Sequence, residues 1–129
     1  MSSEDRQTIA LIAHDGKKNA LVEFVRMHRE WFEQFNLVGT GTTGGRIAEL
    51  GVNIERLASG PLGGDAQIAA RITEGTVHAV IFFRDPMGKH PHEPDINMLL
   101  RQCDVHNIPL ATNRATASLL IGRYAFGGE

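Results

Sequence analysis

The feature that most constrains this chain is a regular alternation of β-rich and helical segments. Five β-rich segments recur along it: TIALIA at 8–13, NLVGT at 36–40, VNIERLAS at 52–59, VHAVIFF at 77–83 and IPLAT at 108–112. Apolar residues at helical spacing predict helices between and after them, over 18–35, 44–50, 65–74, 94–106 and 114–124. Strands and helices that alternate in this way predict a parallel sheet with right-handed crossover helices.

Length and charge limit what such a chain does. Its 129 residues, 42% hydrophobic and 22% charged, fit one globular domain over residues 1–129, with a flexible N-terminus at 1–7. Thirteen basic and fifteen acidic side chains give a net charge of −2, so we expect no nucleic acid and no anionic membrane as partner. The polar start MSSEDRQT lacks an apolar signal region, which predicts a cytoplasmic protein.

The single cysteine and the single tryptophan both lie in apolar stripes at helical spacing. Cys103 ends a stripe that begins at Ile96, and its being alone excludes an intramolecular disulfide and a zinc site made of cysteines. Trp31 belongs to the stripe of the predicted helix over 18–35. We therefore predict that both side chains pack in the core.

The unusual polar and glycine-rich residues gather in the predicted strand-to-helix connections. Ligands of parallel α/β sheets bind beyond the carboxyl ends of the strands, where these connections begin. The connections read AHDGKK, GTGTTGG, SGPLGGDAQ, RDPMGKHPHEPD and TNRAT. The sequence therefore predicts a functional site at this edge of the sheet.

The segment GTGTTG at 39–44 matches G-x-G-x-x-G after a strand and before a helix. A dinucleotide fingerprint needs an acidic residue at the end of the next strand, but that strand ends in LAS. Three hydroxyls, those of Thr40, Thr42 and Thr43, beside the N–H groups of a helix start suit a small phosphate monoester instead. A Gly/Thr turn with ordinary helix caps is the alternative.

Lys18 lies just inside the first predicted helix, where a cation opposes the helix dipole. A bound phosphate would give this charge a partner, and a solvated lysine is the alternative. His14, Asp15 and the segment HPHEPD at 90–95 contain residue types that bind metals. No two histidines share a ligand spacing such as H-E-x-x-H, so we predict no metal.

Asp65 ends the run SGPLGGD and begins the helical pattern DAQIAARITEG. A carboxylate there accepts hydrogen bonds from main-chain N–H groups and interacts favourably with the helix dipole, which favours a helix cap. The same anchoring would hold a catalytic base in place. The residues alone leave both interpretations open.

Together these connections resemble methylglyoxal synthase, in order over roughly residues 8–120. The segments AHDGKK, TGTTGG, SGPLGGDAQ, FFRDP and HPHEPD each correspond to a family segment. The resemblance implies a three-layer α/β/α fold with a five-stranded, doubly wound parallel sheet. It also implies a lyase that converts dihydroxyacetone phosphate to methylglyoxal and inorganic phosphate without a cofactor, in a bypass of glycolysis. The resemblance further implies that the protein assembles as a homohexamer and that inorganic phosphate inhibits it allosterically.

The resemblance also implies roles for single residues. Asp65 would be the catalytic acid/base, and we expect His92 to donate a hydrogen bond to the carbonyl oxygen on which charge develops. Further substrate contacts are implied for His14, Lys18, Thr40, Gly41, Thr42, Thr43, Ser59 and Gly60, while Asp15, Asp85 and Asp95 match supporting positions near the pocket.

The same fold also occurs as a regulatory domain of carbamoyl-phosphate synthetase and as part of a purine-biosynthetic cyclohydrolase. A non-catalytic domain that binds a small anion is therefore the alternative function. Such a domain needs the anion-binding segments but no placed base, whereas this chain contains both Asp65 and His92. Some family members carry a longer tail near a neighbouring subunit where this sequence ends GRYAFGGE, so phosphate regulation across subunits stays open.

Overall fold

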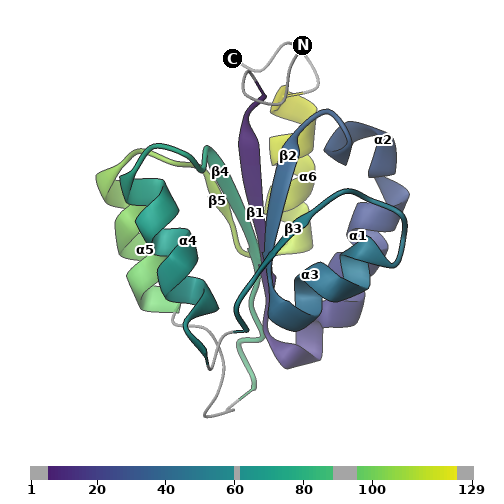
Figure 1. Cartoon of the computed structure of the whole chain (residues 1–129), viewed down its shortest axis with the longest axis horizontal. Helices are drawn as coiled ribbons and strands as arrows, with labels where there is room; N and C mark the ends of the chain where they lie inside the picture. The colour runs from purple at the N-terminus through teal and green to yellow at the C-terminus, as the bar shows by residue number, and fades with distance from the viewer. Residues whose placement is uncertain (1–5, 60–61, 89–95, 125–129) are drawn as a thin grey trace.

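The computed structural model describes residues 6–59, 62–88 and 96–124. Its strands form one sheet in the order β3-β2-β1-β4-β5, and every neighbouring pair is parallel. Helices cover both faces, so the chain folds into three layers (Figure 1). This confirms the predicted fold class. The strands are β1 (Thr8–Ala13), β2 (Asn36–Thr40), β3 (Glu55–Leu57), β4 (Ala79–Phe83) and β5 (Leu110–Ala111).

The helices divide unequally between the two faces of the sheet (Figure 1). One face carries α1 (Lys18–Met27), α2 (Arg29–Phe32), α3 (Gly41–Ala48) and α6 (Arg114–Tyr124). The other face carries α4 (Gly64–Thr73) and α5 (Ile96–Val105). A short 3-10 helix, η2 (Asp15–Lys17), joins β1 to α1. Each face has its own apolar core against the sheet.

The central strand β1 explains why the strand segments read as nearly continuous apolar runs. Ile9 and Leu11 pack into the core under α1, while Ala10 and Ile12 pack into the core under α4. Successive side chains of a strand point to opposite faces, so a strand covered on both faces needs apolar residues at every position. Burial on both faces is therefore the reason that the sequence predicts these strands.

The predicted helix over 18–35 is divided in two, and the prediction of one helix was wrong. His28 leaves helical geometry with φ −114° and ψ 29°, and its N–H donates to the Phe24 oxygen, which ends α1. Its ring packs at a tilt against the Phe24 ring, with centroids 4.7 Å apart. Its own carbonyl oxygen then accepts the N–H groups of Trp31 and Phe32 at 3.0 and 3.1 Å, which starts α2.

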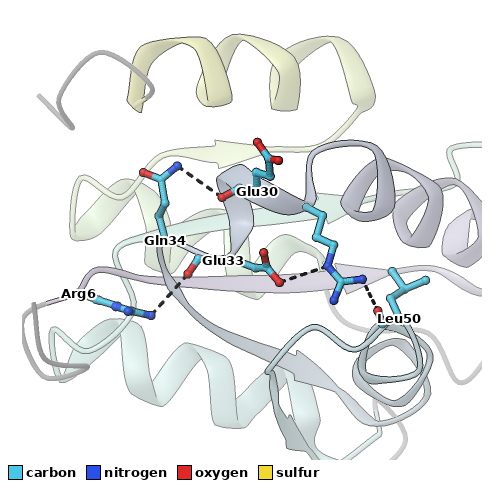
Figure 2. A network of polar contacts seen from close by, with 6 residues as sticks. Arg6, Glu30, Glu33, Gln34 and Leu50 are labelled. Carbon is cyan, nitrogen blue, oxygen red and sulfur yellow. Dashed lines mark hydrogen bonds and ion pairs between the residues drawn. The ribbon is translucent and has the colours of Figure 1, made fainter.

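Local and long-range polar contacts surround α2. Arg6 donates to the main-chain oxygen of Glu33 at 3.5 Å, and Gln34 donates to that of Glu30 at 3.5 Å (Figure 2). Arg29 donates to the main-chain oxygen of Leu50. Of the predicted flexible N-terminus, residue 6 therefore makes a contact, and residues 1–5 lie outside the described residues.

The two core predictions are confirmed. Cys103 is buried in the core under α4 and α5, and burial raises the pKa of its thiol to about 11. Trp31 is buried on the opposite face, with its ring edge-on to Phe32 at 5.0 Å. Among the helices that the structure describes, none combines the length and the hydropathy of a membrane span.

Candidate functional site

The strand order changes direction between β1 and β4. The connection after β1 runs through α1 to β2, toward the edge strand β3. The connection after β4 runs through α5 on the opposite face to β5, the other edge strand. Connections that diverge in this way leave a crevice beyond the carboxyl ends of the two strands. Ala13 pairs with Phe83, so both strands end at the same level and His14 directly follows β1 there.

His14 is held at this point by main-chain contacts from β4 and the residues after it. Its N–H donates to the Phe83 oxygen at 3.1 Å, and its ring nitrogen Nδ1 accepts the N–H of Asp85 at 2.8 Å. His14 is 7% exposed as a residue, and its ring lies edge-on to Phe82, with centroids 5.0 Å apart. Two predicted site residues, His14 and Asp85, are therefore in direct contact.

Lys18 has a charged partner that the sequence motifs did not predict. Its Nζ lies 2.7 Å from Asp15 Oδ1, and the Lys18 side chain is 21% exposed against 67% for Asp15. Residue Lys18 begins α1, as expected. An ammonium group has three donors, so the ion pair leaves capacity for an anion as well.

Helix α3 begins at Gly41, directly after β2 ends at Thr40, and the prediction of a helix start at 44 was wrong. The glycines that argue against helix allow close packing instead. A Cβ on Gly44 would lie 3.1 Å from the Gly39 oxygen, and one on Gly41 would lie 2.8 Å from Ser59 Cα. The segment predicted as a phosphate loop is therefore the first turn of a helix packed against the β3–α4 connection.

The three threonines differ in their surroundings. Thr40 is the N-cap residue of α3 and is buried, Thr42 is exposed, and Thr43 is 1% exposed. Among the residues that the structure describes, Thr43 Oγ1 has no hydrogen-bond partner. The first N–H groups of a helix have no partner within it, and that of Gly41 donates to the Ala58 oxygen at 3.2 Å.

Asp65 is the second residue of α4, and the N-cap position belongs to Gly63, whose φ of +96° favours glycine. The Asp65 side chain is half-buried, and its Oδ1 accepts the N–H of Ala66 at 3.0 Å. It therefore accepts a first-turn N–H, as the cap interpretation requires, without occupying the cap position. Ser59 fixes the residues before α4, because its main-chain oxygen accepts the N–H of Gly64 at 2.9 Å.

Arg56 is a neighbour of the α3 start that sequence reasoning missed. Its Nε donates to the Gly41 oxygen at 3.2 Å, and a Cβ on Gly45 would lie 2.9 Å from its Cζ. Arg56 lies on β3, in no motif, so spacing alone gave no reason to select it. The remaining predicted residues, Gly60, His92 and Asp95, lie outside the described residues.

Across residues 6–59, 62–88 and 96–124, no group of three or more His, Cys, Asp and Glu side chains is placed to hold a metal. A groove of about 550 Å³ lies at the amino ends of the strands, lined in part by Arg6, Asn36, Glu55 and Arg71. Of the predicted site residues that the structure describes, none lines this groove, because they lie at the opposite, carboxyl ends of the strands.

The sequence is similar to those of known proteins that form one family. Residues 20–112 match the family model described as MGS-like domain. A protein of Cupriavidus pinatubonensis named methylglyoxal synthase is 61% identical over 90% of this chain and 90% of its own length. The chain belongs to the methylglyoxal synthase family. A methylglyoxal synthase of Clostridium botulinum is 56% identical over 90% of this chain and 98% of its own length.

A solved structure supports the family assignment at the level of the fold. The crystal structure of methylglyoxal synthase from Elizabethkingia anophelis matches with a TM-score of 0.87 at 46% identity, covering 90% of this chain and 77% of that chain. The resemblance drawn from the five matching segments is thereby confirmed, as is the prediction that the chain is an enzyme of the methylglyoxal synthase family.

Proposed function

We propose that the protein converts dihydroxyacetone phosphate to methylglyoxal and inorganic phosphate, through an enediolate from which phosphate is eliminated. The observation that carries the proposal is the placement of Asp65. Its carboxylate lies in the first turn of α4, on a connection whose Ser59 packs against Gly41 at the start of α3. The Asp65 carboxylate and the start of α3, which suits an anion, therefore lie on neighbouring connections at the carboxyl ends of the strands.

The first turn of α3 supports phosphate binding. Thr43 Oγ1 is buried with no hydrogen-bond partner among the described residues, and a buried hydroxyl left without one is unfavourable. Phosphate oxygens at the helix start would satisfy it together with the first-turn N–H groups. Lys18, Thr40, Thr42 and the segment Ser59-Gly60 complete the proposed phosphate contacts.

Proton abstraction is the first chemical step that we propose. A proton beside the substrate carbonyl is too weakly acidic for water to remove it quickly, so the site needs a base and a donor. Asp65 takes the proton, and His92 and His14 donate hydrogen bonds to substrate oxygens on which charge develops. The role of His92 rests on the family motif HPHEPD. Asp15, Asp85 and Asp95 support the site, and no step uses a metal or a cofactor.

Elimination of phosphate distinguishes this reaction from isomerisation of a triose phosphate. An ester bond perpendicular to the enediolate plane overlaps the π system, so the phosphate leaves, whereas a bond in the plane is retained. We propose that the start of α3 and Lys18 hold the ester bond out of the plane and take up the charge of the leaving group.

The proposed assembly is a homohexamer, with inorganic phosphate as product and inhibitor. Both features are carried over from the family. The purified chain tests the reaction itself: incubation with dihydroxyacetone phosphate should release inorganic phosphate and methylglyoxal in equal amounts. Phosphate binding without any turnover would instead support a non-catalytic, anion-binding domain.

A further inference from the structure

A main-chain contact determines which ring nitrogen of His14 carries the proton. The Asp85 N–H donates to Nδ1 at 2.8 Å, so Nδ1 presents a lone pair. In a neutral imidazole one nitrogen accepts and the other donates, which places the proton on Nε2. The contact joins the first residue after β1 to the second residue after β4, across the point where the strand order changes direction.

The carboxylate of Asp85 holds the segment that supplies this N–H. Its Oδ1 accepts the N–H groups of Met87 and Gly88, both at 3.1 Å. An Asp side chain that accepts main-chain N–H groups two and three residues further on stabilises a turn that begins at the Asp itself. Because the turn fixes the conformation of Asp85, it also fixes the direction of the Asp85 N–H.

The second carboxylate oxygen lies between the two connections. A Cβ added to Gly16 would lie 2.5 Å from Asp85 Oδ2, and one added to Gly88 would lie 2.8 Å from the same atom. Gly16 belongs to η2, two residues after His14. The carboxylate therefore packs against the β1–α1 connection and inside its own turn, where only glycine leaves room for it.

We propose that Asp85 is a positioning residue: its main-chain N–H holds His14 as the Nε2–H tautomer, and its carboxylate acts on its own turn and not on the substrate. The consequence for catalysis rests on the proposed function, because Nε2–H is then the donor that His14 offers to a substrate oxygen. The tautomer itself is a property of the protein without substrate.

The tautomer is measured by ¹H–¹⁵N NMR of the ligand-free protein labelled at histidine, at mildly alkaline pH. A His14→Gln variant identifies the His14 signals. The wild type should show a protonated Nε2 and an unprotonated Nδ1. Asp85→Asn should keep this pattern, because its amide oxygen accepts the same two N–H groups, whereas Asp85→Ala should give a mixture of tautomers. A protonated Nδ1 in the wild type, or an unchanged pattern in Asp85→Ala, would overturn the proposal.

Turnover of dihydroxyacetone phosphate separates a positioning role from a chemical one. Asp85→Ala should lower kcat by up to about 100-fold, the scale of a misplaced catalytic group, and Asp85→Asn should restore most of that loss. A carboxylate that takes part in proton transfer would lose about 10²- to 10⁴-fold in both variants, which would contradict the proposal. Asp104→Ala, at an exposed carboxylate of α5, is the matched control.

Two safeguards keep the test decisive. If Asp85→Ala fails to fold by circular dichroism, Gly16→Ala replaces it, because its methyl group displaces the same carboxylate from the other side. An unchanged His14 pattern in a folded Gly16→Ala would then overturn the proposal. A wild type without turnover refutes the proposed function alone, since the NMR pattern decides the role of Asp85 independently.

Discussion

Asp65 carries the proposed chemistry from a position that is also favourable for a helix. Its carboxylate lies in the first turn of α4 and accepts the N–H of Ala66 at 3.0 Å. Negative charge near a helix N-terminus is stabilising, and the same contact restricts the side chain. The hydrogen bond that stabilises the helix start therefore also holds the carboxylate in place as a base.

Asp65→Asn separates the two roles. The amide keeps the size of the side chain and an oxygen that accepts the Ala66 N–H, but it does not take up a proton. Turnover of dihydroxyacetone phosphate should fall by at least about 10²- to 10⁴-fold. The thermal midpoint should fall only slightly, because the lost charge stabilises the helix start by about 0.3–1 kcal/mol, and phosphate binding should survive. Near-normal phosphate release would make Asp65 a structural residue, with Asp95 or Asp15 as the next candidate base.

Sequence reasoning found side chains but not main-chain groups. Asp65 and Thr43 drew attention as a carboxylate and a hydroxyl at predicted helix starts, each with helix capping as its alternative, and the site role of His14 came from the resemblance to the family. The Asp85 N–H that holds His14 has no signature, because every residue except proline has such a group. Arg56 was missed for a similar reason, since only the packing of β3 against α3 brings it to Gly41.

At the scale of elements, the alternation of strands and helices was predictable, and the ends of elements were not. Apolar runs on strands buried on both faces leave a clear pattern, whereas α3 begins three residues earlier than its glycines suggest. Those glycines are in the helix because two connections approach closely there. The break at His28 likewise has no glycine or proline to announce it.

Gly64→Ala tests whether close packing places the two connections. A Cβ on Gly64 would lie 1.9 Å from the Ala58 oxygen and 2.9 Å from Thr40 Cγ2, so the main chain must move. The variant should lose about 1–3 kcal/mol of stability in urea unfolding, the cost of overpacking. Gly122→Ala is the control, because a Cβ there meets nothing within 4 Å and alanine favours helix. Equal stability of the two variants would refute the packing argument.

At the scale of the whole molecule, the sheet brings residues far apart in sequence to one edge. The order β3-β2-β1-β4-β5 could not be read from the alternation of elements, because it depends on which strands pair. The edge at which the site forms could be predicted, because all parallel strands end there.

Inorganic phosphate should stabilise the folded protein. A ligand that binds only the native state raises the thermal midpoint, and the start of α3 with Lys18 provides the proposed site. We expect a shift with millimolar phosphate at constant ionic strength, and a smaller one for Lys18→Ala. If phosphate leaves the wild-type midpoint unchanged, the protein lacks the anion site.

The proposed homohexamer is tested by light scattering coupled to size exclusion. The expected mass is that of six chains, and it should not change on modest dilution. A species with the mass of one chain would refute the assembly without affecting the proposed reaction.

The fate of the phosphate ester tests the central claim most directly. Dihydroxyacetone phosphate incubated with the purified protein is followed by ³¹P NMR, with Asp65→Asn as control. The ester signal should be replaced by that of inorganic phosphate, with methylglyoxal formed in equal amount, and the control should leave the ester intact. Conversion of the ester to an isomeric triose phosphate, or an unchanged ester with the wild-type protein, would contradict the proposed elimination.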